Sequence, residues 1–232
     1  MATVTDLLNH PVYGMAQVDR LLGLTPSTAR RWIDGYKRGG KAYPPVVRLE
    51  STGEEIVTWG EFVETRLLSE YRDAGVPLVR MRPAIDRLRE LFDQRYPLAH
   101  ARPYVDVAGR ELVLEVQESV GLERALQLVV LRNNQVVLAD GAENFRRAAR
   151  FRTEDGAVEL LHPVTEITEV VIDPLRQFGE PVVQDRSVRT EIIGEQMRAG
   201  EPIDAIAEIY DLPRPSVEAA LRYELIRSGT AA

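Results

Sequence analysis

The sequence predicts an α+β protein with an N-terminal winged helix-turn-helix, a small central antiparallel sheet and a C-terminal three-helix helix-turn-helix unit. At both ends of the chain, apolar residues recur at helical spacing between Gly and Pro residues that mark helix boundaries. In the middle, short apolar runs are separated by turn residues, which is typical of antiparallel strands. We therefore expect domains at residues 1–100, 101–168 and 169–232.

The composition is that of an ordinary soluble protein and excludes several kinds of site. Of the 232 residues, 44% are hydrophobic and 28% are charged, which allows a buried core. The absence of cysteine excludes disulfides, cysteine nucleophiles and thiolate metal sites. The three histidines share no ligand spacing, so we expect no metal site and no cofactor. Without a long apolar run or a signal peptide, the chain is expected to be cytoplasmic and to have no membrane partner.

The charge is distributed unevenly along the chain. The net charge is −7, but residues 1–100 carry +1 and residues 151–232 carry −8. Between residues 20 and 48 there are seven basic residues against one acid, Asp34. A basic cluster of this density suits contact with phosphate, whereas the acidic C-terminal part suits a basic partner. The two ends are therefore expected to bind different molecules.

The basic cluster coincides with a predicted helix-turn-helix. Apolar residues from Val18 to Leu22 have helical spacing, and Gly23 follows as a helix end. The next residues include a Thr-Pro pair, which is typical of a helix start. Helices are therefore expected at residues 15–22 and 26–35.

The second of these helices is expected to present a polar face to solvent. With Ala29 pointing inward, the outward face holds Ser27, Arg30 and Arg31, with Thr28 beside it. In a helix-turn-helix this face enters the major groove of DNA. The opposing interpretation is an ordinary helical hairpin with a solvated charged face.

A wing is expected after the second helix. Residues 46–49 and 55–58 are strand-like and flank a turn at residues 50–53. Thr58 and Glu61 form a capping box that opens a further helix, and the basic loop at residues 37–41 is positioned to reach the DNA backbone. The residues predicted to bind DNA are Ser27, Thr28, Arg30, Arg31, Lys37, Arg38, Lys41 and Arg48.

This N-terminal segment resembles the winged helix of MerR-type regulators. The resemblance lies in residues 15–18 and 24–32, where Thr28, Ala29, Arg30 and Trp32 follow the family's order of residue types. Residues 75–78 resemble the next helical piece of that fold. The resemblance implies a DNA-binding domain. Effector sensing does not follow from it, because no long coiled-coil helix comes after.

The middle segment is expected to be a scaffold or dimerisation element. Strands are predicted at residues 104–107, 111–116, 126–131, 135–138, 149–153 and 157–161. The segment has no Gly-rich phosphate loop and no His beside an acid, so its chemistry suggests no catalytic site.

The C-terminal segment has helix-turn-helix spacing and an acidic surface. Helices are expected at residues 191–198, from Pro202 onward and from residue 215 or 216 onward, where Leu225 is expected to point inward. Acids predominate over cations on these helices, which disfavours phosphate and favours contact with a protein.

The start of this segment resembles an antitoxin-like helix-turn-helix family. The resemblance is carried by Asp173-Pro174, Phe178-Gly179 and Pro181-Val182-Val183, followed by the three-helix unit. Joined to a MerR-like N-terminal part, it is similar to larger VapB-type antitoxins. The resemblance implies a cognate PIN-domain ribonuclease toxin and autorepression at operator DNA.

The sequence thus predicts a non-enzymatic, DNA-binding antitoxin of a type II toxin–antitoxin pair. Residues 173–228 are expected to help neutralise the toxin, and a homodimer is expected to form through residues 62–71, 81–91 or 104–139. One alternative is a MerR-like transcription regulator with no toxin partner. Another is the ribonuclease itself, which is disfavoured because no early Asp lies on a buried apolar strand among other acids.

Overall fold

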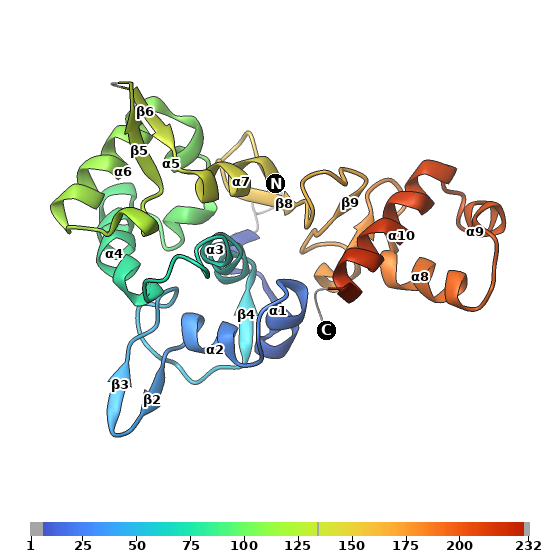
Figure 1. The fold of residues 1–232 in the computed structure, drawn as a ribbon, viewed down its shortest axis with the longest axis horizontal. Helices are drawn as coiled ribbons and strands as arrows, with labels where there is room; N and C mark the ends of the chain where they lie inside the picture. Colours follow the sequence, from blue (N-terminus) through green and yellow to red (C-terminus); the bar gives the residue numbers. More distant parts are fainter. Residues whose placement is uncertain (1–6, 134, 230–232) are drawn as a thin grey trace, which may run out of the picture. The chain divides into compact units, whose positions relative to one another are not determined.

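The protein, seen here as a computed structural model, is described for residues 7–133 and 135–229. Its internal contacts divide the chain into two compact units (Figure 1): unit 1 comprises residues 1–147 and 151–158, and unit 2 comprises residues 148–150 and 159–232. The paired strands β7 (Ala149–Phe151) and β8 (Val158–Leu161) contribute residues to both units. Each unit combines helices with short antiparallel strands, which confirms the predicted α+β class. The division into three domains stays a prediction.

In unit 1, two paired strands flank the helix-turn-helix along the chain. A short 3-10 turn at Leu7–Asn9 precedes β1 (Pro11–Gly14), which pairs antiparallel with β4 (Ile56–Thr58). Four elements lie between these strands along the chain, namely α1 (Met15–Leu21), α2 (Thr28–Ile33), β2 (Tyr36–Arg38) and β3 (Lys41–Tyr43).

Helix α3 (Trp59–Ser69) supplies much of the core of unit 1. It begins at the predicted capping box: the Thr58 hydroxyl accepts a hydrogen bond from the N–H of Glu61 at 3.3 Å, and the Glu61 carboxylate accepts one from the N–H of Thr58 at 3.0 Å. The indole N–H of Trp59 donates to the carbonyl of Val158 at 2.8 Å, which ties the helix to a strand almost a hundred residues later.

The helices expected to form a dimer interface are instead part of this core. The apolar side chains of α3 and of α4 (Arg82–Phe92) are buried within unit 1, with Leu91 the exposed exception on α4. Faces already buried inside one unit are not available to a second chain. The expectation that residues 62–71 and 81–91 form the interface is therefore wrong.

Two of the predicted strands are helical. Residues 104–107 and 111–116 fall in or beside α5 (Arg102–Val105) and α6 (Val107–Ser119). The side chains that α6 buries, Val113, Val116 and Gln117, stand at helical spacing, and this pattern overrides the alternation in the sequence. Gln117 then fixes the following strand, because its amide donates to the carbonyl of Val129 at 3.0 Å.

The remaining elements complete unit 1. They are the 3-10 turns Leu78–Met81, Pro97–Ala99 and Arg124–Leu126, the strands β5 (Val129–Arg132) and β6 (Gln135–Leu138), and α7 (Asp140–Ala148), whose last residue belongs to unit 2. β5 and β6 form the predicted antiparallel hairpin, although residue 134 of its turn lies outside the described residues.

The described part of unit 2 contains a three-stranded antiparallel sheet and three helices. The strands are β9 (Val170–Val171), β10 (Val182–Val183) and β11 (Val188–Arg189), with β10 in the centre, and a 3-10 turn lies at Gln177–Gly179. The helices are α8 (Thr190–Arg198), α9 (Ile203–Tyr210) and α10 (Arg214–Gly229), close to the predicted positions.

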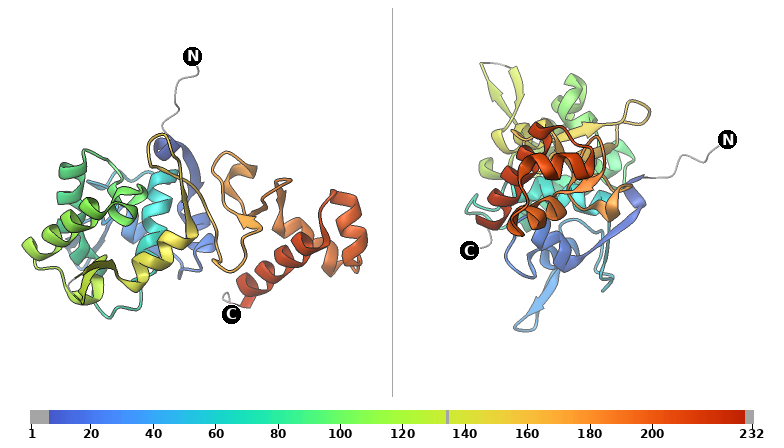
Figure 2. Two further views of the ribbon diagram at one scale, coloured as in Figure 1. Left: turned by 90° about the horizontal axis from the view of Figure 1, so that it is seen from above. Right: turned by 90° about the vertical axis from the view of Figure 1, so that its right-hand side faces the viewer.

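Helix α10 packs against both α8 and α9 (Figure 2). The core between them is apolar and includes Ile193, Ile206 and Val217. Leu225, which was expected to point inward, is exposed. Within the described ranges, no helix is both long and apolar enough to span a membrane, and no group of three or more His, Asp or Glu side chains is arranged to hold a metal ion.

Candidate nucleic-acid interface

The turn of the N-terminal helix-turn-helix is held by a carboxylate from the first helix. Asp19 on α1 is buried, and its two oxygens accept hydrogen bonds from the backbone N–H groups of Ser27 and Ala29, each at 2.7 Å. The residue before α2 is Ser27, which has a left-handed backbone (φ 67°) and provides no cap through its own side chain. Asp19 therefore satisfies N–H groups at the start of α2 that the helix itself leaves unpaired.

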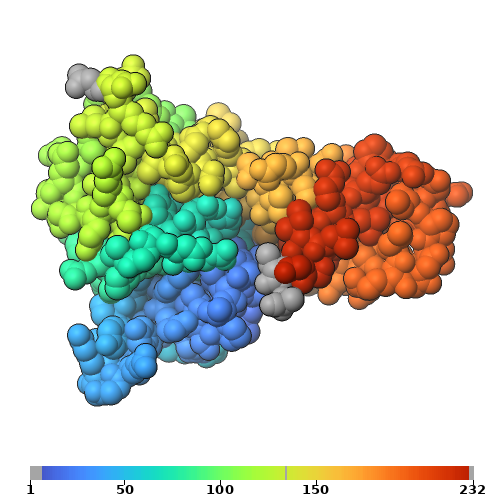
Figure 3. Space-filling view, viewed as in Figure 1, coloured from blue at the N-terminus to red at the C-terminus, as the bar shows by residue number. Residues whose placement is uncertain are grey.

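The wing is a hairpin of basic residues that the sequence indicated only as a loop. β2 and β3 pair antiparallel, with Arg38 opposite Lys41. Gly39 and Gly40 join them, and both have positive φ, as a two-residue turn of this kind requires. The hairpin projects from the surface of unit 1 (Figure 3), and Lys37, Arg38 and Lys41 are exposed on it.

The strands that were predicted to form the wing have other roles. Residues 46–49 are not a strand, because the N–H groups of Val46 and Val47 donate to the carbonyl of Trp32, at 2.8 and 3.1 Å, and both valines are buried. β4 pairs with β1. The predicted position of the wing was therefore wrong.

The base of the wing is closely packed. The rings of Tyr36 and Tyr43 stack with centroids 4.5 Å apart, and the Lys41 ammonium lies 5.3 Å from the centre of the Tyr43 ring. Gly35, immediately before β2, has φ 74°, and a Cβ at this position would lie 2.6 Å from the Tyr43 carbonyl oxygen. Only glycine fits this approach of two backbone segments.

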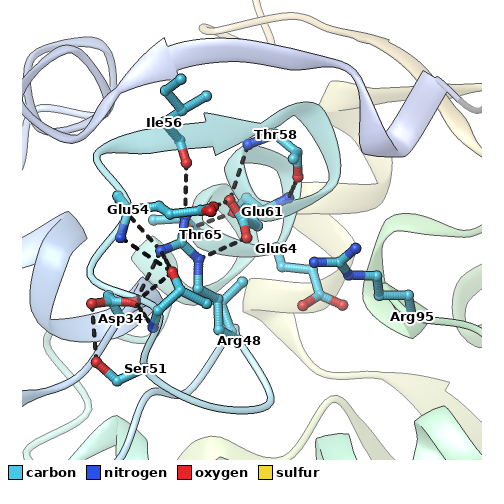
Figure 4. A network of polar contacts seen from close by, with 12 residues as sticks. Asp34, Arg48, Ser51, Glu54, Ile56, Thr58, Glu61, Glu64, Thr65 and Arg95 are labelled. Atoms are coloured by element: carbon cyan, nitrogen blue, oxygen red, sulfur yellow. Dashed lines mark hydrogen bonds and ion pairs between the residues drawn. The ribbon is translucent and has the colours of Figure 1, made fainter.

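Arg48, one of the predicted DNA-binding residues, lies inside unit 1 (Figure 4). Its guanidinium donates to Glu61 and Asp34 at 2.8 and 2.9 Å, and to the carbonyl of Ile56 at 2.7 Å. Burial lowers the pKa of Arg48, but the two carboxylates raise it above its usual value. The charged, buried Arg48 side chain therefore links the end of α2 with α3 and β4.

Asp34, which pairs with Arg48, also holds the loop that follows the wing. It accepts hydrogen bonds from the N–H groups of Thr52 and Gly53, at 2.7 and 3.0 Å, and from the Ser51 hydroxyl at 3.1 Å. Although burial raises the pKa of Asp34, these donors and Arg48 together lower it below its usual value. The loop that carries Glu55 is thereby fixed beside α2.

The other predicted residues differ in their exposure. Thr28 is buried, and its hydroxyl bonds to that of Thr25 at 2.8 Å. Arg30 is partly exposed and forms an ion pair with Glu55. Those exposed on α2 and the wing are Ser27, Arg31, Lys37, Arg38 and Lys41.

An open groove of about 810 Å³ runs along α2. Arg31 lines it together with Trp32, the wing tyrosines and two arginines outside the predicted DNA-binding set, Arg72 and Arg80. Arg72 lies just after α3, and Arg80 lies in the 3-10 turn before α4. The sequence did not indicate these two arginines because they lie far along the chain from the basic cluster. The only signal near them was the resemblance of residues 75–78 to a piece of the same fold.

The C-terminal helix-turn-helix has a different surface. Arg214, at the start of α10, forms ion pairs with Asp204 and Glu218, the latter at 2.9 Å. Arg227 pairs with Glu224 at 2.7 Å. These cations are held by acids of the same unit, which weakens their attraction for phosphate.

Comparisons with known proteins match both ends of the chain. Residues 11–85 match the family described as "Putative DNA-binding HTH domain", and residues 170–223 match the one described as "Protein of unknown function (DUF433)". The crystal structure of Rv2018 from Mycobacterium tuberculosis is similar, with a TM-score of 0.72 and 26% identity, over 91% of this chain and 97% of that one.

Two curated proteins of the same organism are similar over nearly their whole length. "Putative antitoxin VapB45" is 28% identical over 229 residues, covering 91% of this chain and 92% of the relative. "Uncharacterized protein Rv2308" is 41% identical over 224 residues, covering 95% of this chain and 93% of the relative. The chain therefore belongs to the same protein family as Rv2308 of Mycobacterium tuberculosis and carries a helix-turn-helix DNA-binding domain in its N-terminal part.

Proposed function

We propose that this protein is a cytoplasmic antitoxin of a type II toxin–antitoxin pair. Unit 1 binds operator DNA in the manner of MerR-type winged helices, and unit 2 neutralises a PIN-domain ribonuclease toxin. By binding its own operator, the protein represses its own promoter. The name of the relative VapB45 and the opposite charges at the two ends of the chain support this proposal.

The observation that carries DNA binding is the placement of Arg31. It lies on the exposed side of α2, in a groove bounded by the wing residues Tyr36 and Tyr43. A recognition helix beside a basic wing is an arrangement that places a helix in the major groove and cations against the phosphates. The guanidinium of Arg31 donates to the Ser27 carbonyl at 3.2 Å and to the Thr28 hydroxyl at 2.8 Å, which orients it over the start of α2.

The proposed interface differs from the set predicted from the sequence. It keeps Ser27, Arg30, Arg31, Lys37, Arg38 and Lys41, and it adds Arg72 and Arg80. Thr28 and Arg48 are left out because both are buried. Arg30, Arg72 and Arg80 contribute only if DNA displaces the acids they pair with, Glu55, Asp73 and Glu123. The wing cations contribute affinity without sequence preference.

Operator affinity over a salt series tests the DNA-binding part. The DNA is the segment upstream of this chain's gene, and a scrambled duplex of equal composition measures non-specific binding. Arg31→Ala is expected to reduce the preference for operator over scrambled DNA by about 1–3 kcal/mol. Lys41→Ala is expected to weaken both equally and to lower the slope of log affinity against log salt by about one.

Arg214→Ala is the matched control in unit 2. Because Arg214 is already paired with two acids, its removal should leave operator binding unchanged. If Arg214→Ala reduced operator binding more than Arg31→Ala, the DNA reader would be the C-terminal helix-turn-helix, and the proposal would be wrong.

Co-expression with the adjoining reading frame tests the toxin-binding part. The proposal expects that frame to encode a PIN-type ribonuclease, which co-purifies with this protein and loses its RNA-cleaving activity in the complex. If RNA cleavage continued at full rate in the presence of excess protein, the toxin-binding part of the proposal would be wrong. The protein would then be a transcription regulator without a toxin partner.

We also propose that the protein binds its operator as a homodimer. One helix-turn-helix makes few base contacts, and a dimer reads two half-sites about 34 Å apart. Within residues 104–139, Val105, Val107 and Leu131 are exposed apolar side chains that a second copy can bury. Sedimentation at tens of micromolar should show a dimer, and a monomer that retains tight operator binding would contradict this.

A further inference from the structure

Unit 2 displays two large apolar side chains on one short loop. The Phe178 loop, residues 173–180, contains Leu175 and Phe178, whose exposed fractions are 68% and 86%. Single exposed apolar residues are ordinary on protein surfaces. Here two of them share one loop, and the backbone of that loop has an unusual conformation.

Three successive residues of the Phe178 loop are left-handed. The φ angles are 45° at Gln177, 56° at Phe178 and 72° at Gly179. Glycine adopts this conformation without strain, but an aromatic residue does so only where the surrounding structure imposes it. Because the Phe178 side chain is almost fully exposed, burial within unit 2 does not compensate for this strain. Such strain in an exposed loop points to a function outside the fold.

A polar brace holds the loop in this conformation. The Asp173 carboxylate accepts a hydrogen bond from the N–H of Leu175 at 2.9 Å and pairs with the Arg176 guanidinium at 3.0 Å. Arg176 in turn donates to the carbonyl of Gln184 at 2.7 Å, next to β10. The brace uses the loop's polar groups and leaves its two apolar side chains outside.

The surroundings of the loop are acidic. Unit 2 contains eight arginines and fourteen acids, a net charge of −6. Six of those arginines form ion pairs with acids of the same unit. The unit therefore presents a negative field to its partner, and a basic protein surface is the complementary one.

We propose that Leu175 and Phe178 anchor unit 2 in an apolar recess of a basic protein, the ribonuclease toxin. The inference rests on the proposed function, in which the partner is a ribonuclease. A protein that cleaves RNA binds its substrate through a cationic groove, so its surface is basic. An aromatic side chain on a loop whose backbone is braced before binding is the kind of residue that dominates the affinity of a protein interface. The acidic surface steers the encounter, and the two apolar side chains hold the complex.

The test measures the affinity of the full-length chain for the purified product of the adjoining reading frame. Phe178→Gly is expected to weaken the complex at least tenfold, and Leu175→Ala severalfold. Phe178→Gly should leave the midpoint of unfolding unchanged or raise it, since glycine accepts φ 56°. A residue with a purely structural role would show the opposite pattern.

Leu225→Ala is the matched control. Leu225 lies on α10 in the same unit and has an exposed fraction of 73%, close to that of Leu175. Its replacement removes a similar amount of exposed apolar surface to Leu175→Ala and should leave the affinity within about twofold.

The outcomes separate this inference from the proposed function. If the wild-type chain does not bind the adjoining product, both are overturned. If the wild-type chain binds and Phe178→Gly binds equally well, the docking role of the loop is wrong and the antitoxin function stands. A destabilised Phe178→Gly, or one with a changed oligomeric state, would also overturn the assignment, because it would place Phe178 in the fold or in a contact between copies.

Discussion

The carboxylate of Asp19 on α1 accepts a hydrogen bond from the backbone N–H of Ala29 on α2, at 2.7 Å. With the matching bond from Ser27, it fixes the angle at which α2 leaves the turn, and therefore the direction of the side chains that α2 presents. The position of the candidate recognition helix thus depends on a buried acid that does not belong to that helix.

Asp19→Asn is expected to lower the free energy of unfolding by about 1.5–3 kcal/mol, because a neutral amide cannot accept both N–H groups as the carboxylate does. Operator affinity should also fall. Urea denaturation measures the first effect and DNA titration the second. The exposed Glu111→Gln on α6 is the control and should change stability by no more than about 0.5 kcal/mol.

Arg48→Met is expected to destabilise unit 1 by about 3–5 kcal/mol, since it leaves Asp34 and Glu61 buried without their counter-charge. Arg87→Met removes an exposed ion pair with Glu90 and should cost about 0.5 kcal/mol or less. Denaturant unfolding compares the two. If Arg48→Met kept full stability and lost operator binding, Arg48 would belong to the DNA interface after all.

Gly35→Ala is expected to displace the wing, whereas Gly23→Ala is its control. Both glycines have positive φ, so each alanine carries a similar backbone strain of about 1–2 kcal/mol. Only at Gly35 does the added Cβ meet other atoms, and these are backbone atoms of Tyr43 and Pro45. Gly35→Ala should therefore lose more stability and more DNA affinity than Gly23→Ala, and equal losses would argue against the close approach.

Glu64 on α3 makes the stability of unit 1 dependent on pH. Burial raises the pKa of Glu64 to about 7, against the opposing effects of the Arg89 guanidinium at 3.7 Å and the N–H of Leu98 at 3.1 Å. Among the described residues, its second carboxylate oxygen has no hydrogen-bond partner. The carboxyl group is thus held in an environment that favours its neutral form.

The pH effect arises because the pKa of Glu64 differs between the folded and the unfolded protein. Below pH 4.5, the ordinary pKa, Glu64 is protonated in both states; between that value and about 7, the unfolded state loses the proton first. The free energy of unfolding therefore falls as pH rises through this range, by on the order of 3 kcal/mol in total. Glu64→Gln should remove this fall, as urea denaturation at several pH values would show. Parallel pH curves for the two proteins would contradict the prediction.

The sequence by itself determined the elements whose signals are local. The capping box at Thr58 and Glu61, the Gly23 helix end and the Pro202 helix start each lie within a few residues of the structure they specify. The basic cluster and the acidic C-terminal part are also properties of composition, which folding does not change. These features were sufficient to predict the α+β class and both helix-turn-helix units.

Only the tertiary structure decided which basic residues lie outside and which strand pairs with which. Arg48 has the same charge as Arg31, but it is buried where it pairs with two acids, Glu61 on α3 and Asp34 at the end of α2. β4 became the partner of β1 and not of its neighbour in sequence, and the helical burial of Val113 and Val116 overrode an alternating pattern. In each case the deciding energy comes from contacts between segments far apart in the chain, and a local window of sequence does not contain them.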